Sequence, residues 1–407
     1  MQETPKGSRL HIAIFGRRNA GKSSLINALT NQDIALVSNV PGTTTDPVYK
    51  AMEILPIGPV MVIDTAGIDD VGDLGALRVE RTMQVLNKTD LAVIVIDPEE
   101  GITSFEEELV KEIRKRNLPI AGVVNKSDTK TVSPAELATW RQMLALPLLL
   151  ISAKTGQGIE ELKRQMIKLA PDDWEGPQLI GDLVSPGDTV VLVVPIDLAA
   201  PKGRLILPQV QTIRDLLDND ACAVVVKERE LKEALDSLKN PPRLVVTDSQ
   251  EFMKVGADTP SEVMLTSFSI LMARHKGDLE TLVAGAKAID ALQPGDKVLI
   301  AEGCTHHRQA DDIGKVKIPR WLRQSVGGEL DFAWVSGGTF PPDLTKYKLI
   351  VHCGACMLNR REMLYRLAIA REAGVPIVNY GLLIAQIHGI LYRALAPFPL
   401  AQMILEE

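Results

Sequence analysis

The 407-residue chain is longer than one ordinary hydrophobic core, so we expect two or three domains. A hydrophobic fraction of 45%, a charged fraction of 24% and frequent polar interruptions of the apolar runs exclude a membrane-spanning protein. A net charge of −7 without a basic block argues against a large nucleic-acid interface. The N-terminus lacks a signal-peptide core, and we therefore predict a cytoplasmic protein with neither membrane nor nucleic acid as a partner.

The first part of the chain alternates short apolar runs with helical patterns. Five such runs, the first at Leu10 and the last at Leu146, each end in a polar or glycine turn. This alternation predicts strand–helix–strand units and a parallel sheet that is covered on both faces. Residues 171–188 are rich in proline, glycine and aspartate and predict a linker.

Two further α/β units are expected after the linker. The second unit holds apolar runs at residues 189–197, 221–226 and 242–248 and has no catalytic signature. Residues 262–292 predict two helices that open the third unit, and four apolar runs follow them. The predicted fold class is α/β with parallel sheets in the first and third domains. The predicted domains are residues 1–172, 173–262 and 263–407.

A phosphate-binding loop stands between the first predicted strand and helix. The sequence from Gly16 to Ser24, GRRNAGKSS, fits the pattern G-x-x-x-x-G-K-[ST] in that context. Its glycines permit a turn whose N–H groups converge on phosphate oxygens, and the helix N-terminus adds partial positive charge. Lys22 is expected to reach the β- and γ-phosphates, and Ser23 to bind Mg²⁺. The loop residues expected at the nucleotide are Asn19, Ala20, Gly21, Lys22, Ser23 and Ser24.

Later motifs complete a guanine-nucleotide site. In NKSD, Asp128 can accept the two N–H donors of guanine, whereas adenine would leave this carboxylate poorly paired. In DTAG, Asp64 is expected to support Mg²⁺ and Gly67 to face the γ-phosphate. In the segment PGTTTD, Thr43 and Thr44 are candidates to bind Mg²⁺ and the γ-phosphate. The other expected contacts are Asn125, Lys126, Ser152, Ala153 and Lys154.

This motif order predicts a GTPase domain that binds GTP or GDP with Mg²⁺ and catalyses hydrolysis through Lys22, Thr44 and Gly67. Ile68 stands where Ras-like proteins carry the glutamine that orients the attacking water, so slow unaided hydrolysis is expected. Asn19 resembles the asparagine that helps to bind potassium in GTPases of the TrmE/Era branch. That resemblance implies stimulation by K⁺, and a purely structural Asn19 is the alternative.

The cysteines predict a second site. Four cysteines in a chain of this length form no disulfide framework, and cytoplasmic thiols stay reduced. Clustered cysteines favour metal or redox chemistry. Cys222 stands alone in an apolar run, where a cysteine is expected to be a small core residue without a functional role. The other three form the pattern C-x-H and H-C-x-x-C with Cys304, His306, His352, Cys353 and Cys356.

Both halves of this pattern follow predicted strands. If those strands lie in one parallel sheet, their carboxyl ends open into the same crevice. Zinc would take the three cysteines and one histidine as a closed site. An iron–sulfur cluster would take the three thiolates and leave a fourth iron to His306, His352, Glu302 or an outside ligand. Spacing does not decide between the metals, and buried cysteines without a metal are a third possibility.

A GTPase of TrmE/Era type joined to C-x-H and H-C-x-x-C resembles, over the whole chain, the HydF family of [FeFe]-hydrogenase maturation GTPases. The resemblance implies a homodimer formed by the middle domain and a [4Fe–4S] cluster on Cys304, Cys353 and Cys356. It also implies a scaffold that takes a transient di-iron precursor from the radical-SAM maturases HydE and HydG and delivers it to the apo-hydrogenase HydA. An exchangeable fourth iron position suits such a carrier. GTP hydrolysis would gate these associations.

Two other functions fit parts of the pattern. A tRNA-modification or ribosome-assembly GTPase of TrmE/Era type with a structural zinc module is disfavoured by the acidic chain and by the C-terminus, which lacks the expected Cys-x-Gly-Lys. A redox sensor that uses Cys353 and Cys356 as a dithiol would leave Cys304 and the histidines unexplained.

Overall fold

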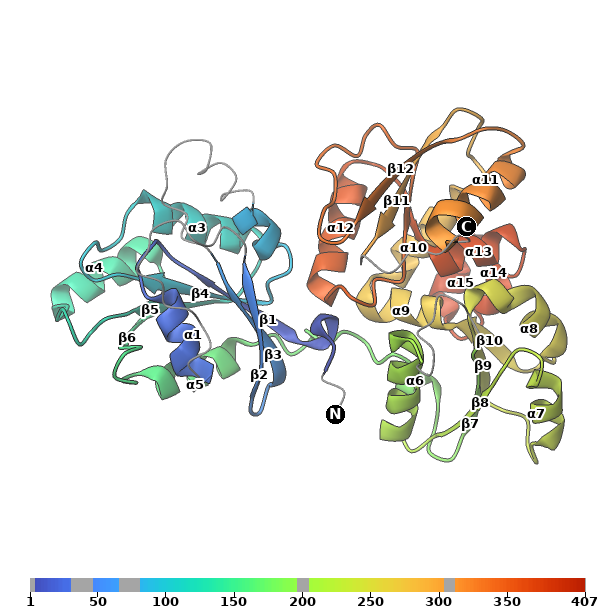
Figure 1. Ribbon diagram of the computed structural model, residues 1–407, viewed down its shortest axis with the longest axis horizontal. Helices are drawn as coiled ribbons and strands as arrows, with labels where there is room; N and C mark the ends of the chain where they lie inside the picture. The colour runs from blue at the N-terminus through green and yellow to red at the C-terminus, as the bar shows by residue number, and fades with distance from the viewer. Residues whose placement is uncertain (1–3, 31–46, 66–80, 196–204, 304–311, 407) are drawn as a thin grey trace. The chain divides into compact units, whose positions relative to one another are not determined.

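The computed structural model describes residues 4–30, 47–65, 81–195, 205–303 and 312–406 (Figure 1). The chain divides into two compact units, Met1–Glu175 and Gly176–Glu407. This division falls inside the segment that the composition predicts as a linker. No described helix combines the length and the apolar character that a membrane crossing requires.

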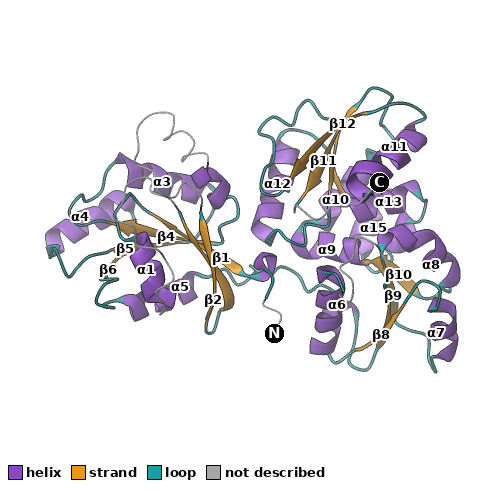
Figure 2. Ribbon diagram, in the orientation of Figure 1, coloured by secondary structure: helices purple, strands orange, loops and turns teal. Residues whose placement is uncertain are grey.

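The first unit is built on one six-stranded sheet, which Figure 2 shows between layers of helices. Its strands are β1 (Leu10–Phe15), β2 (Val48–Ile54), β3 (Gly58–Asp64), β4 (Leu91–Ile96), β5 (Ile120–Val124) and β6 (Leu148–Leu150). Their order is β2-β3-β1-β4-β5-β6, and every neighbouring pair is parallel except β2 with β3. Every residue of β1 and β4 is buried, as expected where helices cover both faces. The predicted α/β fold with a mainly parallel sheet is confirmed.

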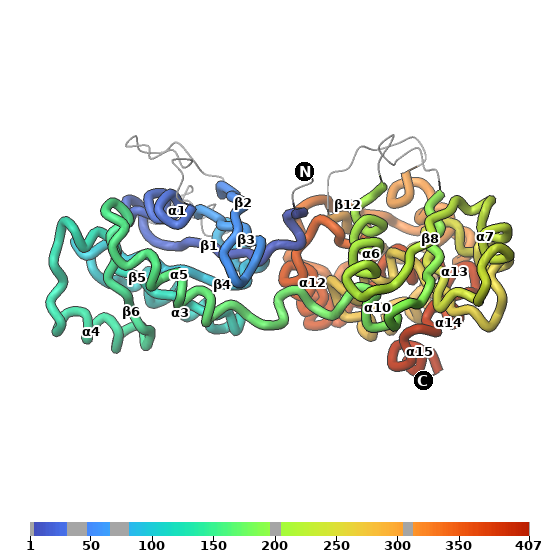
Figure 3. Tube along the Cα trace, turned by 90° about the horizontal axis from the view of Figure 1, so that it is seen from below, coloured from blue at the N-terminus to red at the C-terminus, as the bar shows by residue number. Residues whose placement is uncertain are grey.

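Helices cover this sheet on both sides. They are α1 (Lys22–Thr30), α3 (Ser104–Lys115), α4 (Pro134–Leu144) and α5 (Ile159–Leu169). Apolar side chains of α1 and α5 pack in one core layer, and those of α3 and α4 pack in the other. Figure 3 shows α1 and α4 on opposite sides of the strands. Helix α4 begins at a capping box, in which Ser133 Oγ accepts from the Glu136 N–H and the Glu136 carboxylate accepts from the Ser133 N–H.

The antiparallel edge strand β2 is absent from the sequence-based expectations. Its residues alternate between exposed and buried because only one face of the edge strand packs against the unit. Such a strand lacks the continuous apolar run that predicts the other strands.

The second unit contains two four-stranded parallel sheets. The first has the order β10-β9-β7-β8, and the second has the order β12-β11-β13-β14. The strands are β7 (Thr189–Val193), β8 (Cys222–Val226), β9 (Leu244–Thr247), β10 (Met264–Ser267), β11 (Lys297–Glu302), β12 (Asp331–Ser336), β13 (Leu349–His352) and β14 (Ile377–Asn379). The parallel sheet predicted for the C-terminal region is confirmed.

Helices surround and join these two sheets. They are α6 (Leu207–Asp218), α7 (Leu231–Ser237), α8 (Phe252–Asp258), α9 (Phe268–Lys276), α10 (Leu279–Lys287), α11 (Ile318–Val326), α12 (Arg360–Glu372), α13 (Tyr380–Ile387), α14 (Leu391–Ala394) and α15 (Pro399–Glu406). Strand β10 lies beyond the predicted domain boundary at residue 262, yet it pairs with β9 and so belongs to the first of the two sheets.

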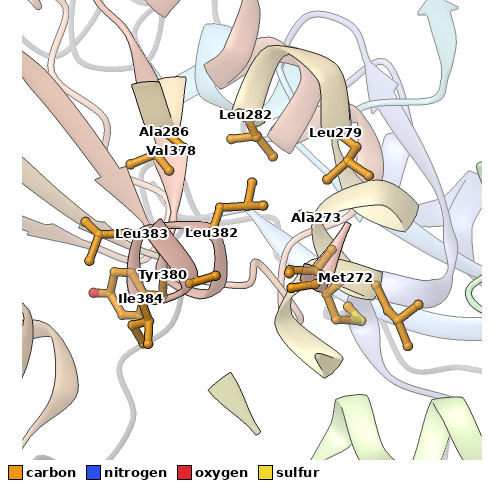
Figure 4. Close-up of a cluster of buried hydrophobic side chains, with 14 of the residues drawn as sticks. Met272, Ala273, Leu279, Leu282, Ala286, Val378, Tyr380, Leu382, Leu383 and Ile384 are labelled. Atoms are coloured by element: carbon orange, nitrogen blue, oxygen red, sulfur yellow. The ribbon is translucent and has the colours of Figure 1, made fainter. Parts of the chain in front are cut away.

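One continuous apolar core extends through both sheets of the second unit. Figure 4 shows part of it, where side chains of α9 and α10 meet those of β14 and α13. Helix α10 approaches β14 closely at Gly285, where a Cβ would lie 1.9 Å from the Ile377 carbonyl oxygen. The absence of a side chain at Gly285 therefore permits this helix to pack on the strand.

The expectation that Cys222 is a core residue is wrong. Cys222 begins β8, which is the edge strand of its sheet, and its side chain is exposed. An apolar run predicts a strand but does not show whether that strand lies at the centre or at the edge of a sheet.

Candidate functional site

The phosphate loop joins β1 to α1 in a conformation that needs its glycines. Gly16 and Gly21 have φ angles of +154° and +86°. A Cβ on Gly16 would lie 2.4 Å from the Val95 carbonyl oxygen, and one on Gly21 would lie 2.3 Å from Asn125 Nδ2. Asn19, the candidate potassium ligand, is exposed and has a φ of +60°. The loop thus presents its backbone at the N-terminus of α1, as a phosphate site requires.

The Lys22 side chain packs against this loop. Its ammonium group donates to the carbonyl oxygens of Gly16 at 2.8 Å and Arg17 at 2.7 Å. The side chain is buried, so its charge is weakly screened by water. This geometry places a cation where the oxygens of a bound polyphosphate converge.

The candidate magnesium ligands lie at the start of α1 and the end of β3. Ser23 Oγ donates to Asp64 Oδ2 at 2.7 Å. Burial raises the pKa of the Asp64 carboxyl above its ordinary value, while Ser23 and Lys22 partly oppose that rise. A hydroxyl and a carboxylate in contact are oxygen donors that suit Mg²⁺, so the residues present fit this ion.

The base side of the site is organised by Asn125. Its Nδ2 donates to the carbonyl oxygen of Ala20 at 3.0 Å, and its Oδ1 accepts from the Ala153 N–H at 3.0 Å. Asn125 thereby connects the phosphate loop, the end of β5 and the loop after β6. Each polar atom of this buried amide binds one backbone group, and its second N–H and second acceptor lone pair stay available to a nucleotide.

Asp128 is exposed and is oriented by the loop after β6. Ser152 Oγ donates to Asp128 Oδ1 at 2.6 Å and holds the pKa of this carboxyl below its ordinary value. The charge of Lys154 acts in the same direction. An ionised carboxylate can accept both N–H donors of a guanine edge, as the sequence predicts.

Two supporting groups were missed from the sequence. Asp97, directly after β4, accepts from Lys126 Nζ at 2.7 Å. Arg17 in the phosphate loop contacts Glu106 at 2.8 Å and Glu100 at 2.6 Å, so the loop is anchored to the start of α3. The segment DPEEG after the strand was a visible signal, but its acidic residues could equally have been a solvated turn.

The described candidate nucleotide residues therefore gather at the carboxyl edge of one sheet. They come from the phosphate loop, the end of β3 and the loops after β5 and β6. Thr43, Thr44 and Gly67 lie outside the described residues, and their predicted catalytic and binding roles stay predictions.

The second candidate site lies at the carboxyl ends of two neighbouring strands. Strands β11 and β13 are parallel partners, and Ala301 pairs with His352. The N–H of Gly303, just after β11, donates to Cys353 Sγ at 3.0 Å, and the Ala355 N–H lies 3.5 Å from the same sulfur. Ala355 has a φ of +54°, which turns the backbone back toward Cys353. The end of β11 and the Cys-x-x-Cys loop thus meet at one edge of one sheet.

The sulfur environment has features of a metal-binding loop. Cys353 and Cys356 are half-buried. Burial raises the pKa of the Cys353 thiol, and the N–H groups of Gly303 and Ala355 oppose this rise. Backbone N–H groups that point at a sulfur stabilise negative charge on a thiolate, which is the form that binds metals.

Other predicted metal-site residues have different positions. Among the described residues, no three histidine, cysteine or acidic side chains gather as a metal site. Cys304, which follows Gly303, and His306 lie outside the described residues. Glu302, a candidate fourth ligand, is buried at the end of β11, where Tyr380 Oη lies 3.5 Å from its Oε1.

His352 has protein partners at both of its ring nitrogens. Its Nδ1 lies 2.8 Å from the carbonyl oxygen of Cys353, and its Nε2 lies 3.0 Å from Arg366 Nη1. Burial and then the Arg366 charge lower the pKa of His352 to about 3, so the ring is neutral. In this arrangement both ring nitrogens are engaged, and neither offers a lone pair to a metal.

Fold and site geometry together define the first unit as a P-loop GTPase domain. Residues 11–126 match the family model described as 50S ribosome-binding GTPase. Residues 179–277 match the model of the hydrogen maturase F dimerization domain, and residues 280–397 match that of its tetramerization domain. The chain belongs to the hydrogen maturase F (HydF) family.

Curated relatives resemble the first unit. The tRNA modification GTPase MnmE of Chromobacterium violaceum is 35% identical over 161 residues, which is 39% of this chain and 34% of MnmE. GTPase Der of a Sulfurihydrogenibium species is 35% identical over 181 residues, which is 42% of this chain and 40% of Der. The chain thus spans well under half the length of these relatives. A crystal structure of Era from Aquifex aeolicus, bound to GDP and aluminium fluoride, has 22% identity, covers 61% of this chain and 99% of Era, and gives a TM-score of 0.37.

Proposed function

We propose that this chain is a cytoplasmic GTPase that carries a [4Fe–4S] cluster and serves as a scaffold in [FeFe]-hydrogenase maturation. It would accept a di-iron precursor as cargo from HydE- and HydG-type maturases and deliver it to a HydA-type apo-hydrogenase. The contact between the Gly303 N–H and Cys353 Sγ carries this proposal. It brings the chain just before Cys304 against the Cys-x-x-Cys loop.

The choice of iron over zinc follows from the family. A closed zinc site would need His306 or Glu302 as its fourth ligand, because His352 uses both ring nitrogens elsewhere. Three thiolates can hold a cubane cluster and leave one iron for His306, Glu302 or an exchangeable outside ligand. Such an open position suits a protein that transfers cargo. The two hydrogen maturase F domain models support this function, and they do not favour a tRNA-modification GTPase with a zinc module.

Anaerobic purification tests this assignment. The full chain should show the absorption and EPR spectra of a [4Fe–4S] cluster, with matching iron and sulfide contents. Cys353→Ser should abolish the cluster and leave GTP hydrolysis within about twofold of wild type. Cys222→Ser is the matched control and should retain the cluster, because this exposed thiol lies on β8. A colourless, zinc-loaded wild-type protein would contradict the proposal.

The GTPase would act as the control device. Lys22, Ser23 and Asp64 would hold the phosphates and Mg²⁺, and Asn19 would contribute to a K⁺ site. Lys22→Ala should abolish GTP hydrolysis and retain the cluster. If Lys22→Ala and Cys353→Ser each gave a folded protein without the cluster and without GTP hydrolysis, the proposal that the two sites act separately would be wrong.

Hydrogen bonds at the start of the second unit would connect the segment after the GTPase domain with the helix that follows the cysteine loop. Pro177 accepts through its carbonyl oxygen at 2.8 Å from His275 Nδ1. Arg360 donates to the carbonyl oxygens of His275 at 3.0 Å and Gly277 at 2.8 Å. Arg360 begins α12, four positions after Cys356. The segment that follows the GTPase domain is therefore packed against the same helix that leads away from the cysteine loop.

A homodimer would form at the edge strand β8. Within the described part of the chain, β8 pairs on one side only, with β7. Its outer N–H and C=O groups are free to pair with a strand of a second copy, as open sheet edges do. The match to the hydrogen maturase F dimerization domain at residues 179–277 supports this location.

A further inference from the structure

His352 precedes the first cysteine of the Cys-x-x-Cys loop but has its own hydrogen-bonding partners. A carbonyl oxygen only accepts, so Nδ1, which faces the Cys353 carbonyl at 2.8 Å, must carry the ring proton. A guanidinium only donates, so Nε2, which faces Arg366 Nη1 at 3.0 Å, must accept. These partners determine one neutral tautomer of the ring.

Arg366 is held in place from several sides. Its Nη2 donates to the Gly337 carbonyl oxygen at 2.7 Å and to Glu362 Oε1 at 2.8 Å. The guanidinium carbon lies 5.1 Å from the centre of the Phe340 ring. The side chain is only 1% exposed, and its Nε has no hydrogen-bond partner in the described structure. Holding a cation in such a site is unfavourable unless negative groups lie close to it.

The charges around Arg366 come from two elements. Glu362, one turn earlier on α12, supplies one carboxylate. The Cys353 sulfur lies on the loop after β13, and a chain of contacts connects it with Arg366. Arg366 donates to the Gly337 carbonyl oxygen, the Gly337 N–H donates to the Glu302 carbonyl oxygen, and the next residue, Gly303, donates to Cys353 Sγ. Arg366 is therefore a buried cation at the same edge of the sheet as a sulfur that Gly303 and Ala355 already supply with N–H donors.

We propose that His352 is a positioning residue and not a metal ligand: it holds the Arg366 guanidinium beside the Cys353 sulfur, where this charge sets the reduction potential of the bound cluster. The inference rests on the proposed [4Fe–4S] cluster. A reduced cluster carries one more negative charge than the oxidised one, so a nearby cation stabilises it and raises the potential. The carboxylate of Glu362 has the opposite effect and limits that rise.

Redox titration of the anaerobically prepared full chain, followed by EPR, tests this role. Arg366→Gln removes the charge and should make the potential more negative at unchanged iron content. Arg366→Lys retains the charge and should restore most of the wild-type potential. Glu362→Gln removes the opposing charge and should shift the potential in the positive direction. Arg371→Gln is the matched control, because Arg371 is an exposed arginine in the last turn of the same helix.

The tautomer of His352 is tested with a second variant. His352→Gln keeps a side-chain oxygen that can accept from Arg366, so the cluster should be retained with a potential near that of wild type. Pulsed EPR should show the same nitrogen couplings in wild type and His352→Gln. A strong nitrogen coupling that is present in wild type and lost in His352→Gln would identify His352 as a ligand and overturn the inference.

The remaining outcomes separate this inference from the proposed function. A wild-type protein that assembles no cluster would refute both. A loaded wild type whose potential equals that of loaded Arg366→Gln would overturn the positioning role and leave the scaffold proposal intact. If Arg366→Gln does not fold, the direction of the Glu362→Gln shift decides: an unchanged or more negative potential contradicts the role of this charge pair.

Discussion

The side-chain amide of Asn125 donates a hydrogen bond to the carbonyl oxygen of Ala20, 3.0 Å away, and so joins the guanine-recognition loop to the phosphate loop. The same side chain accepts from the Ala153 N–H. Because Gly21 leaves room for this amide, the three loops can meet without a side chain between them. One buried side chain thus links the loops that carry the candidate base and phosphate contacts.

Asn125→Ala should weaken the binding of both GTP and GDP by about 10- to 30-fold, since two buried hydrogen bonds of about 1 kcal/mol each are lost. The dissociation constants can be measured with a fluorescent GDP analogue and by competition with GTP. Thr129→Ala, in the same loop but with an exposed local hydrogen bond, should bind both within about twofold of wild type. Equal affinities for wild type and Asn125→Ala would show that the loops do not depend on this link.

Asp128→Asn should change the base preference of the site. The carboxylate is expected to accept both guanine N–H donors, and an amide in its place presents one donor toward them, so GTP affinity should fall by about 100-fold or more. Xanthosine triphosphate, which has a carbonyl in place of the guanine amino group, should gain affinity. Competition binding of the two nucleotides measures the switch. If the affinities for GTP and for xanthosine triphosphate both fell, the substitution would have disrupted the loop and not changed base recognition.

Val225→Pro should prevent dimerisation without unfolding the second unit. The N–H groups of Cys222 and, by alternation, Val224 face β7, so the N–H of Val225 faces the open edge. Proline there removes an outward donor and no described intramolecular ladder bond. Light scattering should show a loss of dimer, with the circular dichroism spectrum unchanged.

Val225→Thr is the matched control, since it keeps the N–H and the β-branched shape at this 46% exposed position. It should remain dimeric. A dimer of normal stability in Val225→Pro would place the interface elsewhere.

Protonation of His275 should lower the stability of the second unit in mild acid. Burial lowers the pKa of His275 to about 4, against an unfolded value near 6.5, so the unfolded chain takes up a proton first. The contribution of the neutral ring is present above pH 6.5 and is lost as the pH falls toward 4. The loss is expected to be roughly 2–3 kcal/mol.

Urea unfolding from pH 8 to 4.5 measures this effect. Wild type should lose more stability over this range than His275→Gln, whose side chain takes up no proton. Parallel stability curves for the two proteins would mean that His275 is not the responsible group.

Much of the nucleotide site was predictable because its motifs are local. The loop from Gly16 to Ser24 lies between a strand and a helix, and both are evident from apolar periodicity. The carboxyl ends of parallel strands share one edge, so the motif order alone predicts that Asp64, Asn125 and Asp128 lie close together. The side-chain contacts were less predictable: the two backbone bonds by which Asn125 links the loops appear only in the structure, and its predicted contact with the nucleotide stays a prediction.

The sequence by itself determined the class of protein, through the ordered GTPase motifs and the three cysteines at strand ends. Only the tertiary structure decided which groups His352 contacts, that Cys222 is exposed, and that β10 completes the first sheet of the second unit. These properties depend on which strand lies at an edge and which way a side chain points. Both follow from packing between segments that are distant in the chain, and hydrophobic periodicity carries no information about such partners.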